Sequence, residues 1–263
     1  RIIGPGTVAK PVLITNLRSK KMGKNLNKHI FKQVRNACLN YGLIENGDRI
    51  AVGASGGKDS VTLLCFLDLL KKYTPLKFEI IPIYLDLGWD NDLTGLQELC
   101  TSLELNLVVE PTNIGYVVFE ARHESNPCSL CSNLRRGALN RKAKSLNCNK
   151  VALGHQLDDA VNTLLMSMIF EGRFHVFKPL AYLDRMDITV IRPLVYVEEK
   201  DIRAFCASVP YPLVKNKCPA DGYTSRTKVG DIVCEIEAKY PGARKRIFSA
   251  LTKAEPGSFW PQN

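Results

Sequence analysis

The segment Arg49–Ser60, RIAVGASGGKDS, decides the fold of this 263-residue chain. Its first half, Arg49–Ala54, predicts a buried strand, because its apolar residues are consecutive. The run Ser60–Tyr73 has the apolar spacing of a helix. Between them, the adjacent glycines Gly56 and Gly57 let backbone N–H groups converge on an anion, and the start of a helix adds its dipole. The segment therefore predicts a phosphate-binding loop between a strand and a helix.

Strands and helices alternate along the rest of the chain. An amphipathic helix is expected over 24–42, and later helices at Asp92–Leu103, Cys131–Leu146 and Asp158–Glu171. Four more strands are expected, at Phe78–Leu85, Leu105–Glu110, Lys150–Gly154 and Ile188–Arg192. Strands that alternate with helices form parallel sheets with right-handed crossovers. We therefore expect an α/β fold, an open parallel five-stranded Rossmann-like sheet with helices on both faces.

Three parts of the chain differ in pattern. Residues 1–21 hold five cations and no acid, lack a clear period and precede a Met-Gly-Lys that could start a natural chain. We expect them to be either a leader added for expression or a natural extension. Residues 22–195 are expected to form the catalytic domain with its N-terminal helix. Residues 196–263 lack strand signals and are expected to form a small helical appendage that supplies Cys218.

The net charge of +10 is concentrated in two places. Residues 1–21 contribute half of it. The segment 120–150 contributes the other half, with seven cations against two acids. A solvated helix face and a polyanion-binding surface both fit such a run. No stretch is apolar enough for a membrane span and no signal peptide is readable, so we expect a cytoplasmic protein without membrane contact.

The glycine loop is not a Walker loop, because Val52 and Asp59 stand where that motif needs a glycine and a serine or threonine, and it is not a dinucleotide fingerprint, because Ser55 replaces the second glycine. Instead, SGGKDS resembles the pyrophosphatase (PP) loop of adenine nucleotide alpha hydrolases, which split ATP into AMP and pyrophosphate. This resemblance implies that Asp59 helps to hold Mg²⁺. The expected nucleotide-binding residues of this unit are Ala54, Ser55, Gly56, Gly57, Lys58, Asp59 and Ser60.

A second motif, Gly154-His155-Gln156-Leu157-Asp158-Asp159, follows the fourth strand. Ligands of an open parallel sheet bind beyond the carboxyl ends of its strands, at the switch in strand order. We expect Gly154 and His155 to line the nucleotide pocket there. Asp158 and Asp159 could bind Mg²⁺, or could only cap the helix that follows. Asp86, at the end of the second strand, is a weaker candidate for the same pocket.

Three of the nine cysteines stand out. Cys128 and Cys131 form a C-x-x-C that enters a basic helix, where thiolates are stabilised, and Cys218 precedes a proline. These residues alone allow four interpretations. They are a structural zinc site, a thioredoxin-like redox pair, cysteines without a shared role, and an iron–sulfur or sulfur-relay site.

The combination of SGGKDS, CSLCSNLRRG, GHQLDD and a late Cys-Pro resembles the TtcA/TtuA family of tRNA thiolases over residues 24 to 250. The resemblance implies a [4Fe–4S] cluster on Cys128, Cys131 and Cys218. Zinc fingers that some 2-thiouridine-forming relatives carry at both ends are not readable here, so the chain is most similar to the 2-thiocytidine branch. A catalytic lysine of some relatives falls on Arg135, which suits phosphate stabilisation better than proton transfer.

The resemblance implies an ATP-dependent enzyme that adenylates the C2 oxygen of a tRNA pyrimidine and replaces it with sulfur. Its implied partners are tRNA, a sulfur donor (sulfide or a persulfide-carrying protein) and a second copy of the chain. Three alternatives stay open: a lysidine-type nitrogen-transferring ligase, a redox or cluster-binding protein that senses a nucleotide, and a sulfur-handling enzyme that acts on a small molecule. The expected catalytic residues are Cys128, Cys131, Cys218, Asp59, Arg135 and Asp159.

Overall fold

A computed structural model of the chain describes residues 21–122, 127–215, 217–219 and 225–253. The expected leader, except for residue 21, lies outside these ranges. The helices and strands are α2 (Lys21–Tyr41), β1 (Arg49–Gly53), α3 (Lys58–Tyr73), β2 (Glu79–Asp86), α4 (Thr94–Ser102), β3 (Val108–Pro111), α5 (Ile114–Tyr116), η1 (Val117–Ala121), α6 (Pro127–Ser145), β4 (Lys150–Ala152), α7 (Leu157–Glu171), β5 (Leu180–Leu183), η2 (Asp184–Met186), β6 (Ile188–Ile191), α8 (Glu199–Cys206), α9 (Ser225–Lys239) and α10 (Ala243–Lys253).

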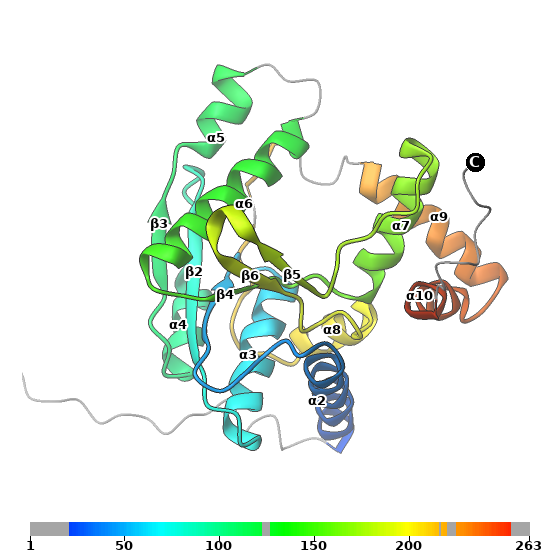
Figure 1. Ribbon diagram of the computed structural model, residues 1–263, viewed down its shortest axis with the longest axis horizontal. Coiled ribbons are helices and arrows are strands. Elements are labelled where there is room, and N and C mark those ends of the chain that lie inside the picture. Colours follow the sequence, from blue (N-terminus) through cyan, green and yellow to red (C-terminus); the bar gives the residue numbers. More distant parts are fainter. Residues whose placement is uncertain (1–20, 123–126, 216, 220–224, 254–263) are drawn as a thin grey trace, which may run out of the picture.

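The described strands form one sheet in the order β3-β2-β1-β4-β6-β5, as Figure 1 shows in part. The five expected strands are confirmed and pair in parallel, and β1 lies beside β4 at the switch in strand order. The count of five was wrong by one, because β5 adds an antiparallel edge strand to β6. β5, Leu-Ala-Tyr-Leu, is a short apolar run that is only partly buried, and so short a run does not by itself distinguish a strand from other structure.

Alternate residues of β1 supply the cores on the two faces of the sheet. Ile50 and Val52 pack with apolar side chains of α2, α3, α4 and α8. Ala51 packs on the opposite face with Leu139 and Ala143 of α6. Side chains alternate across a strand, so a strand buried on both faces reads as a continuous apolar run. Helices therefore cover both faces of the sheet, as expected.

The helices after residue 195 pack in two different places. Ile202 and Phe205 of α8 are fully buried in the main core, beside α3. α9 and α10 instead pack on α7, where Val229 and Val233 meet Leu157. Figure 1 shows these two helices at one side of the molecule. A boundary at residues 195 and 196 stays a prediction, and α8 shares its core with the sheet. No helix in the described ranges has both the length and the apolarity that crossing a membrane requires.

Candidate active site

The phosphate loop joins β1 to α3 at the carboxyl edge of the sheet. Gly56 has φ +75°, a left-handed conformation that glycine adopts without a steric penalty. Gly57 is extended and immediately precedes the first residue of α3. The Ser60 hydroxyl donates to the Gly57 carbonyl at 3.0 Å, and the hydroxyl oxygens of Ser55 and Ser60 are 3.2 Å apart. These bonds fix a loop whose glycine amides lie at a helix N-terminus, the local geometry that binds phosphate.

Lys58 is held by two carboxylates beside this loop. Its Nζ lies 2.9 Å from Asp59 Oδ2 and 3.2 Å from Glu199 Oε1. Burial works against its charge, but the hydrogen bonds and charges of Asp59 and Glu199 prevail and raise the pKa of Lys58. The lysine is therefore charged at neutral pH. Sequence analysis missed Glu199, because it reaches the loop from the start of α8.

The two aspartates of the second motif have different surroundings. Asp158 is buried, accepts a hydrogen bond from the Glu199 amide at 2.7 Å, and pairs with Arg244 at 2.8 Å. Asp159 accepts the Gln156 amide in a capping box and pairs with Arg226 at 3.2 Å. Capping is thus part of what this motif does. Asp158 in addition ties α7 to α8 and α10.

Asp59 and Asp159 fit a magnesium ion better than Asp158 does. Asp59 Oδ1 is buried and no hydrogen-bond partner for it exists among the described residues. Burial raises the pKa of Asp159, and the nearby Asp59 carboxylate raises it further. An added Cβ on Gly154 would lie 3.1 Å from the Asp59 Cβ, so this glycine lets α7 and the loop approach each other. Mg²⁺ takes oxygen ligands and would relieve both the unpaired oxygen and the repulsion.

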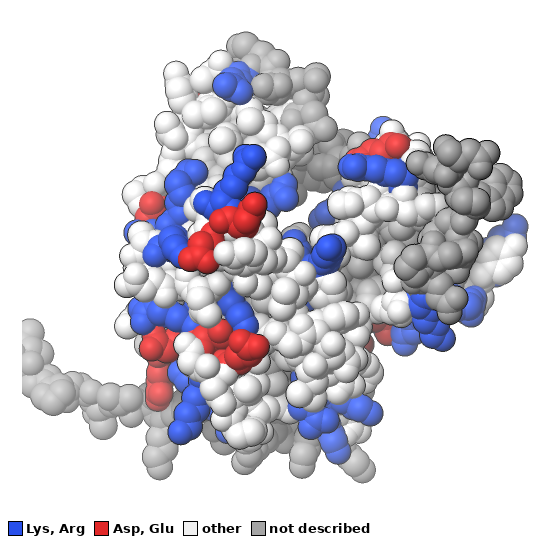
Figure 2. Space-filling model, in the orientation of Figure 1, with Lys and Arg blue, Asp and Glu red and all other residues white. Residues whose placement is uncertain are grey.

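A cavity of about 1200 Å³ lies beyond the carboxyl edge of β1 and contains the loop and all three singled-out cysteines. Figure 2 shows an opening between α6 and α7 on one face, with Lys and Arg atoms along its margin. Of the expected site residues, those that line the cavity are Ala54, Ser55, Gly57, Lys58, Asp59, Cys128, Cys131, Arg135, His155 and Cys218. Those outside its lining are Gly56, Ser60, Asp86, Gly154, Asp158 and Asp159.

Asp86 takes part in a turn rather than in the cavity wall. Its Oδ1 accepts a hydrogen bond from the Gly88 amide at 2.9 Å, and its carbonyl accepts from Thr112. Its neighbours Leu85 and Leu87 do line the cavity. Asp86 itself is not among the lining residues, and its role in nucleotide binding stays a prediction.

The three thiols come from two elements. Cys128 is exposed and Cys131 buried, both in the first turn of α6, and Cys218 is half-buried on the segment after α8. Burial raises the pKa of the Cys131 thiol, the Arg135 charge opposes this, and Cys218 and Cys128 are near enough to raise it further. In the described ranges no group of three His, Cys, Asp or Glu side chains lies close enough for a single metal ion. A [4Fe–4S] cluster binds each thiolate on a different iron, so it suits three thiols spread around one cavity.

The cavity also holds residues that sequence analysis did not single out. Four of them are Arg192 directly after β6, Phe177 in the loop before β5, Lys215 and Arg226. Arg192 stands at the carboxyl end of a buried strand, just as Asp158 and Asp159 follow one, and that position could have drawn attention to it. Phe177 and Lys215 lie in irregular segments whose local sequence carries no such signal.

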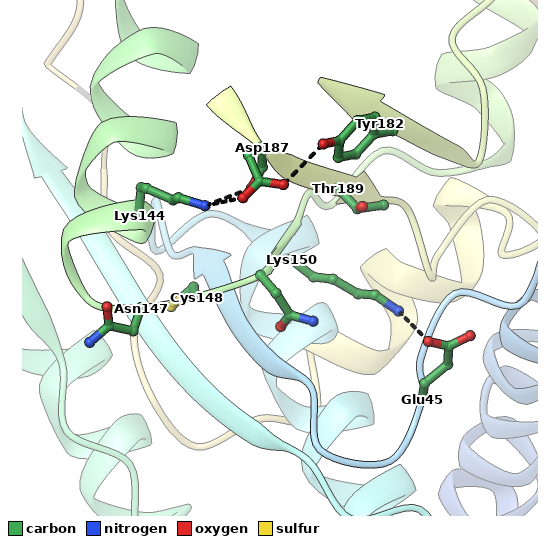
Figure 3. A pocket seen from close by; sticks show the side chains of 9 residues that line it. Glu45, Lys144, Asn147, Cys148, Lys150, Tyr182, Asp187 and Thr189 are labelled. Carbon is green, nitrogen blue, oxygen red and sulfur yellow. Dashed lines mark hydrogen bonds and ion pairs between the residues drawn. The ribbon is translucent and has the colours of Figure 1, made fainter. Parts of the chain in front are cut away.

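A second hollow of about 460 Å³ lies at the opposite edge of the sheet, and four charged residues that form ion pairs are part of its lining. Figure 3 shows Asp187 directed at Lys144 and Tyr182, and Lys150 directed at Glu45. The ion pair of Lys144 with Asp187 joins the end of α6 to the β5–β6 hairpin. Three basic residues of the segment 120–150 form such ion pairs, since Lys150 pairs with Glu45 and Lys142 pairs with Glu110 at 2.7 Å. The cations of this segment that line the large cavity are Arg135 and Arg136.

Comparisons with known proteins show which family and which fold this chain resembles. A family model described as a PP-loop domain matches residues 24–227. A tRNA-cytidine(32) 2-sulfurtransferase from Geotalea daltonii is 39% identical over 88% of this chain and 93% of its own. A protein of the same name from Geobacter sulfurreducens is 38% identical over 92% of this chain and 93% of its own. A solved structure, the U34-tRNA thiolase NcsA from Methanococcus maripaludis with its [4Fe–4S] cluster, matches with a TM-score of 0.70 at 24% identity, over 88% of this chain and 80% of that one.

Proposed function

The chain belongs to the PP-loop family, among the TtcA-type tRNA thiolases, and from this premise we propose that it converts a cytidine of tRNA to 2-thiocytidine at the expense of ATP. The names of its relatives point to cytidine 32 as the target. The observation that carries the proposal is that the phosphate loop and the three cysteines line one cavity. Activation of the base by ATP and delivery of sulfur to it can therefore take place without release of the activated RNA.

The loop and Lys58 would bind the phosphates of ATP. When the O2 oxygen of the cytosine attacks the α-phosphate, pyrophosphate leaves and negative charge develops on both parts. The glycine amides and the Lys58 ammonium group lie where they can stabilise that charge. We infer that Asp59 and Asp159 hold Mg²⁺, which would neutralise phosphate charge. The lining position of Arg135 allows it to contact the adenylate from the thiol side.

The sulfur side of the reaction would use Cys128, Cys131 and Cys218. These thiols would hold a [4Fe–4S] cluster, which when bound supplies a carrier for sulfide. Sulfide must come from a donor, either free sulfide or a persulfide on another protein, whose outer sulfur is released as sulfide when a thiol supplies the two electrons and is oxidised to a disulfide. The neighbouring charge of Arg135 favours the thiolate form of Cys131 that cluster binding needs. Dimer formation and a cytoplasmic location stay predictions.

The test is tRNA thiolation by the full chain after anaerobic purification. The wild-type protein is expected to release pyrophosphate in a tRNA-dependent manner, to contain iron and sulfide, and to form 2-thiocytidine in digested tRNA when sulfide is supplied. Cys218→Ala is expected to lose iron and thiolation. Cys234→Ser, which changes an exposed cysteine outside the cavity, is the matched control and should keep both. A wild-type protein that thiolates without iron would contradict the cluster, and pyrophosphate release without tRNA would contradict the substrate.

A further inference from the structure

Arg192 is buried without an opposite charge. Its side chain is one of the cavity walls, and the residue is 8% exposed. Its Nε donates to His155 Nδ1 at 3.2 Å, its Nη1 donates to the Lys178 carbonyl at 2.6 Å, and the guanidinium lies 4.8 Å from the centre of the Phe177 ring. No carboxylate of the described residues forms an ion pair with it.

Other buried charges of the described chain are paired. Lys150 meets Asp48 at 2.8 Å, and Asp158 meets Arg244 at 2.8 Å. Burying a charge costs free energy unless an opposite charge or hydrogen bonds compensate it. Arg192 therefore differs from Lys150 and Asp158. Its charge contacts only a neutral ring nitrogen, a carbonyl oxygen and an aromatic face.

His155 is neutral beside Arg192, so it neither offsets nor adds to the positive charge there. Burial, followed by the charges of Arg192, Arg226 and Arg136, lowers the pKa of His155 to about 3. The ring is thus neutral at neutral pH. Because Nδ1 accepts from Arg192, the ring proton lies on Nε2, and the imidazole is held in one tautomer.

Two more guanidinium groups line the same part of the cavity. Arg136 lies near enough to Arg192 that its charge, after burial, lowers the pKa of Arg192 to about 10. Arg136 forms a hydrogen bond to Asn133 at 2.8 Å and no ion pair within the described ranges. Arg226 is offset by Asp159 at 3.2 Å. The cluster of Arg192 and Arg136 therefore has an excess of positive charge that a bound anion would neutralise.

The geometry points to a second phosphate-binding site, formed by Arg192 and Arg136 and separate from the glycine loop. Arg192 follows β6, and β4 lies between β6 and β1, so the two sites are two strand spacings or roughly 10 Å apart along the sheet edge. Arginine binds phosphate oxygens through two parallel hydrogen bonds. The inference rests on the proposed function for its two sources of phosphate, which are the backbone of the tRNA beside the target cytidine and the terminal phosphates of ATP.

The test compares Arg192→Gln and Arg136→Gln with Arg185→Gln in the full chain. Arg185 is an exposed arginine outside the cavity, so its variant carries the same loss of charge. Binding of labelled tRNA without ATP and binding of ATP without tRNA are measured at fixed salt. We expect Arg192→Gln to weaken one of the two by about tenfold or more, Arg136→Gln to weaken the same one, and Arg185→Gln to change neither by more than about twofold.

Loss of tRNA affinity alone assigns the site to an RNA phosphate, and loss of ATP affinity alone assigns it to the nucleotide. Either result supports the site, whereas variants of Arg192 and Arg136 that bind both ligands like the wild type overturn it. If Arg192→Gln fails to fold in a urea titration, Arg136→Gln carries the test, because Arg136 is exposed. Binding does not require thiolation. A wild-type protein that forms no 2-thiocytidine therefore refutes the proposed function alone, and unaffected binding in the variants refutes the phosphate site alone.

Discussion

Replacing Gly56 by alanine should destabilise the protein through two separable effects. The first is backbone strain, because Gly56 has φ +75° and a left-handed conformation costs other residues about 1–2 kcal/mol. The second is overpacking, because the added Cβ would lie 2.1 Å from Val214 Cγ2 and 2.7 Å from Val214 Cβ. Overpacking of this kind costs about 1–3 kcal/mol. The sum is about 2–5 kcal/mol of unfolding free energy.

Val214 cannot easily move aside. Its backbone amide donates to the Gly56 carbonyl at 3.0 Å, which fixes the segment that leads to Cys218 against the phosphate loop. Gly56→Ala should therefore also reduce tRNA-dependent pyrophosphate release. Urea unfolding followed by circular dichroism measures the stability of each variant.

Two further variants separate the effects. Gly172 has φ +63° and nothing within 4 Å of an added Cβ, so Gly172→Ala should show only the strain of about 1–2 kcal/mol. Val214→Gly removes both atoms that Gly56→Ala would meet, so the cost of Gly56→Ala in that background should fall by about 1–3 kcal/mol. Equal costs in the two backgrounds, or a Gly56→Ala cost no larger than that of Gly172→Ala, would refute the reasoning.

Four further outcomes follow from charges described above. The folded protein keeps His155 neutral down to about pH 3, whereas the unfolded chain protonates it below about pH 6.5. The free energy of unfolding should therefore decrease as the pH is lowered through that window. Between pH 7 and 5 the wild type should lose about 2 kcal/mol more than His155→Asn in urea titrations, and equal losses would contradict this. Asp158→Asn should cost about 2–3 kcal/mol in thermal unfolding, because it leaves the partly buried Arg244 without its charged partner. Glu199→Gln should lower the KM for ATP about two- to fivefold, since Lys58 then has one competing carboxylate fewer, and a raised KM would argue against it. Raising salt from 50 to 200 mM should weaken tRNA binding at least tenfold, and binding independent of salt would exclude a phosphate-dominated interface.

The parts of the fold that the sequence predicted are those set by local pattern. The apolar run of β1 and the two glycines after it mark the strand, the loop and the start of α3, because each feature depends on residues next to one another. β5 was not predicted, because the run Leu180–Leu183 is apolar but too short to identify a strand on its own. What makes it a strand is its antiparallel pairing with β6 across a turn in which Asp187 adopts φ +47°.

The candidate site was predictable where a motif supplies the residue and unpredictable where tertiary packing does. The C-x-x-C spacing identified Cys128 and Cys131 in the sequence, and the structure places Cys218 in the same cavity. The partners of Asp158 come from α8 and α10, so its sequence motif alone could not separate a metal ligand from an anchor of the fold. The proposal that Arg192 binds phosphate depends on the absence of a carboxylate around it among the described residues, and the sequence next to Arg192 cannot show that absence.

The placement of the three thiols has a consequence for how the protein is made. Two of them open α6, and the third lies after α8, far along the chain. During synthesis the first pair leaves the ribosome long before Cys218 exists. A cofactor that needs all three therefore has no complete site on the nascent polypeptide. A cofactor that uses all three thiols can be completed only after residue 218 has been translated, so its site depends on both the middle and the late part of the chain.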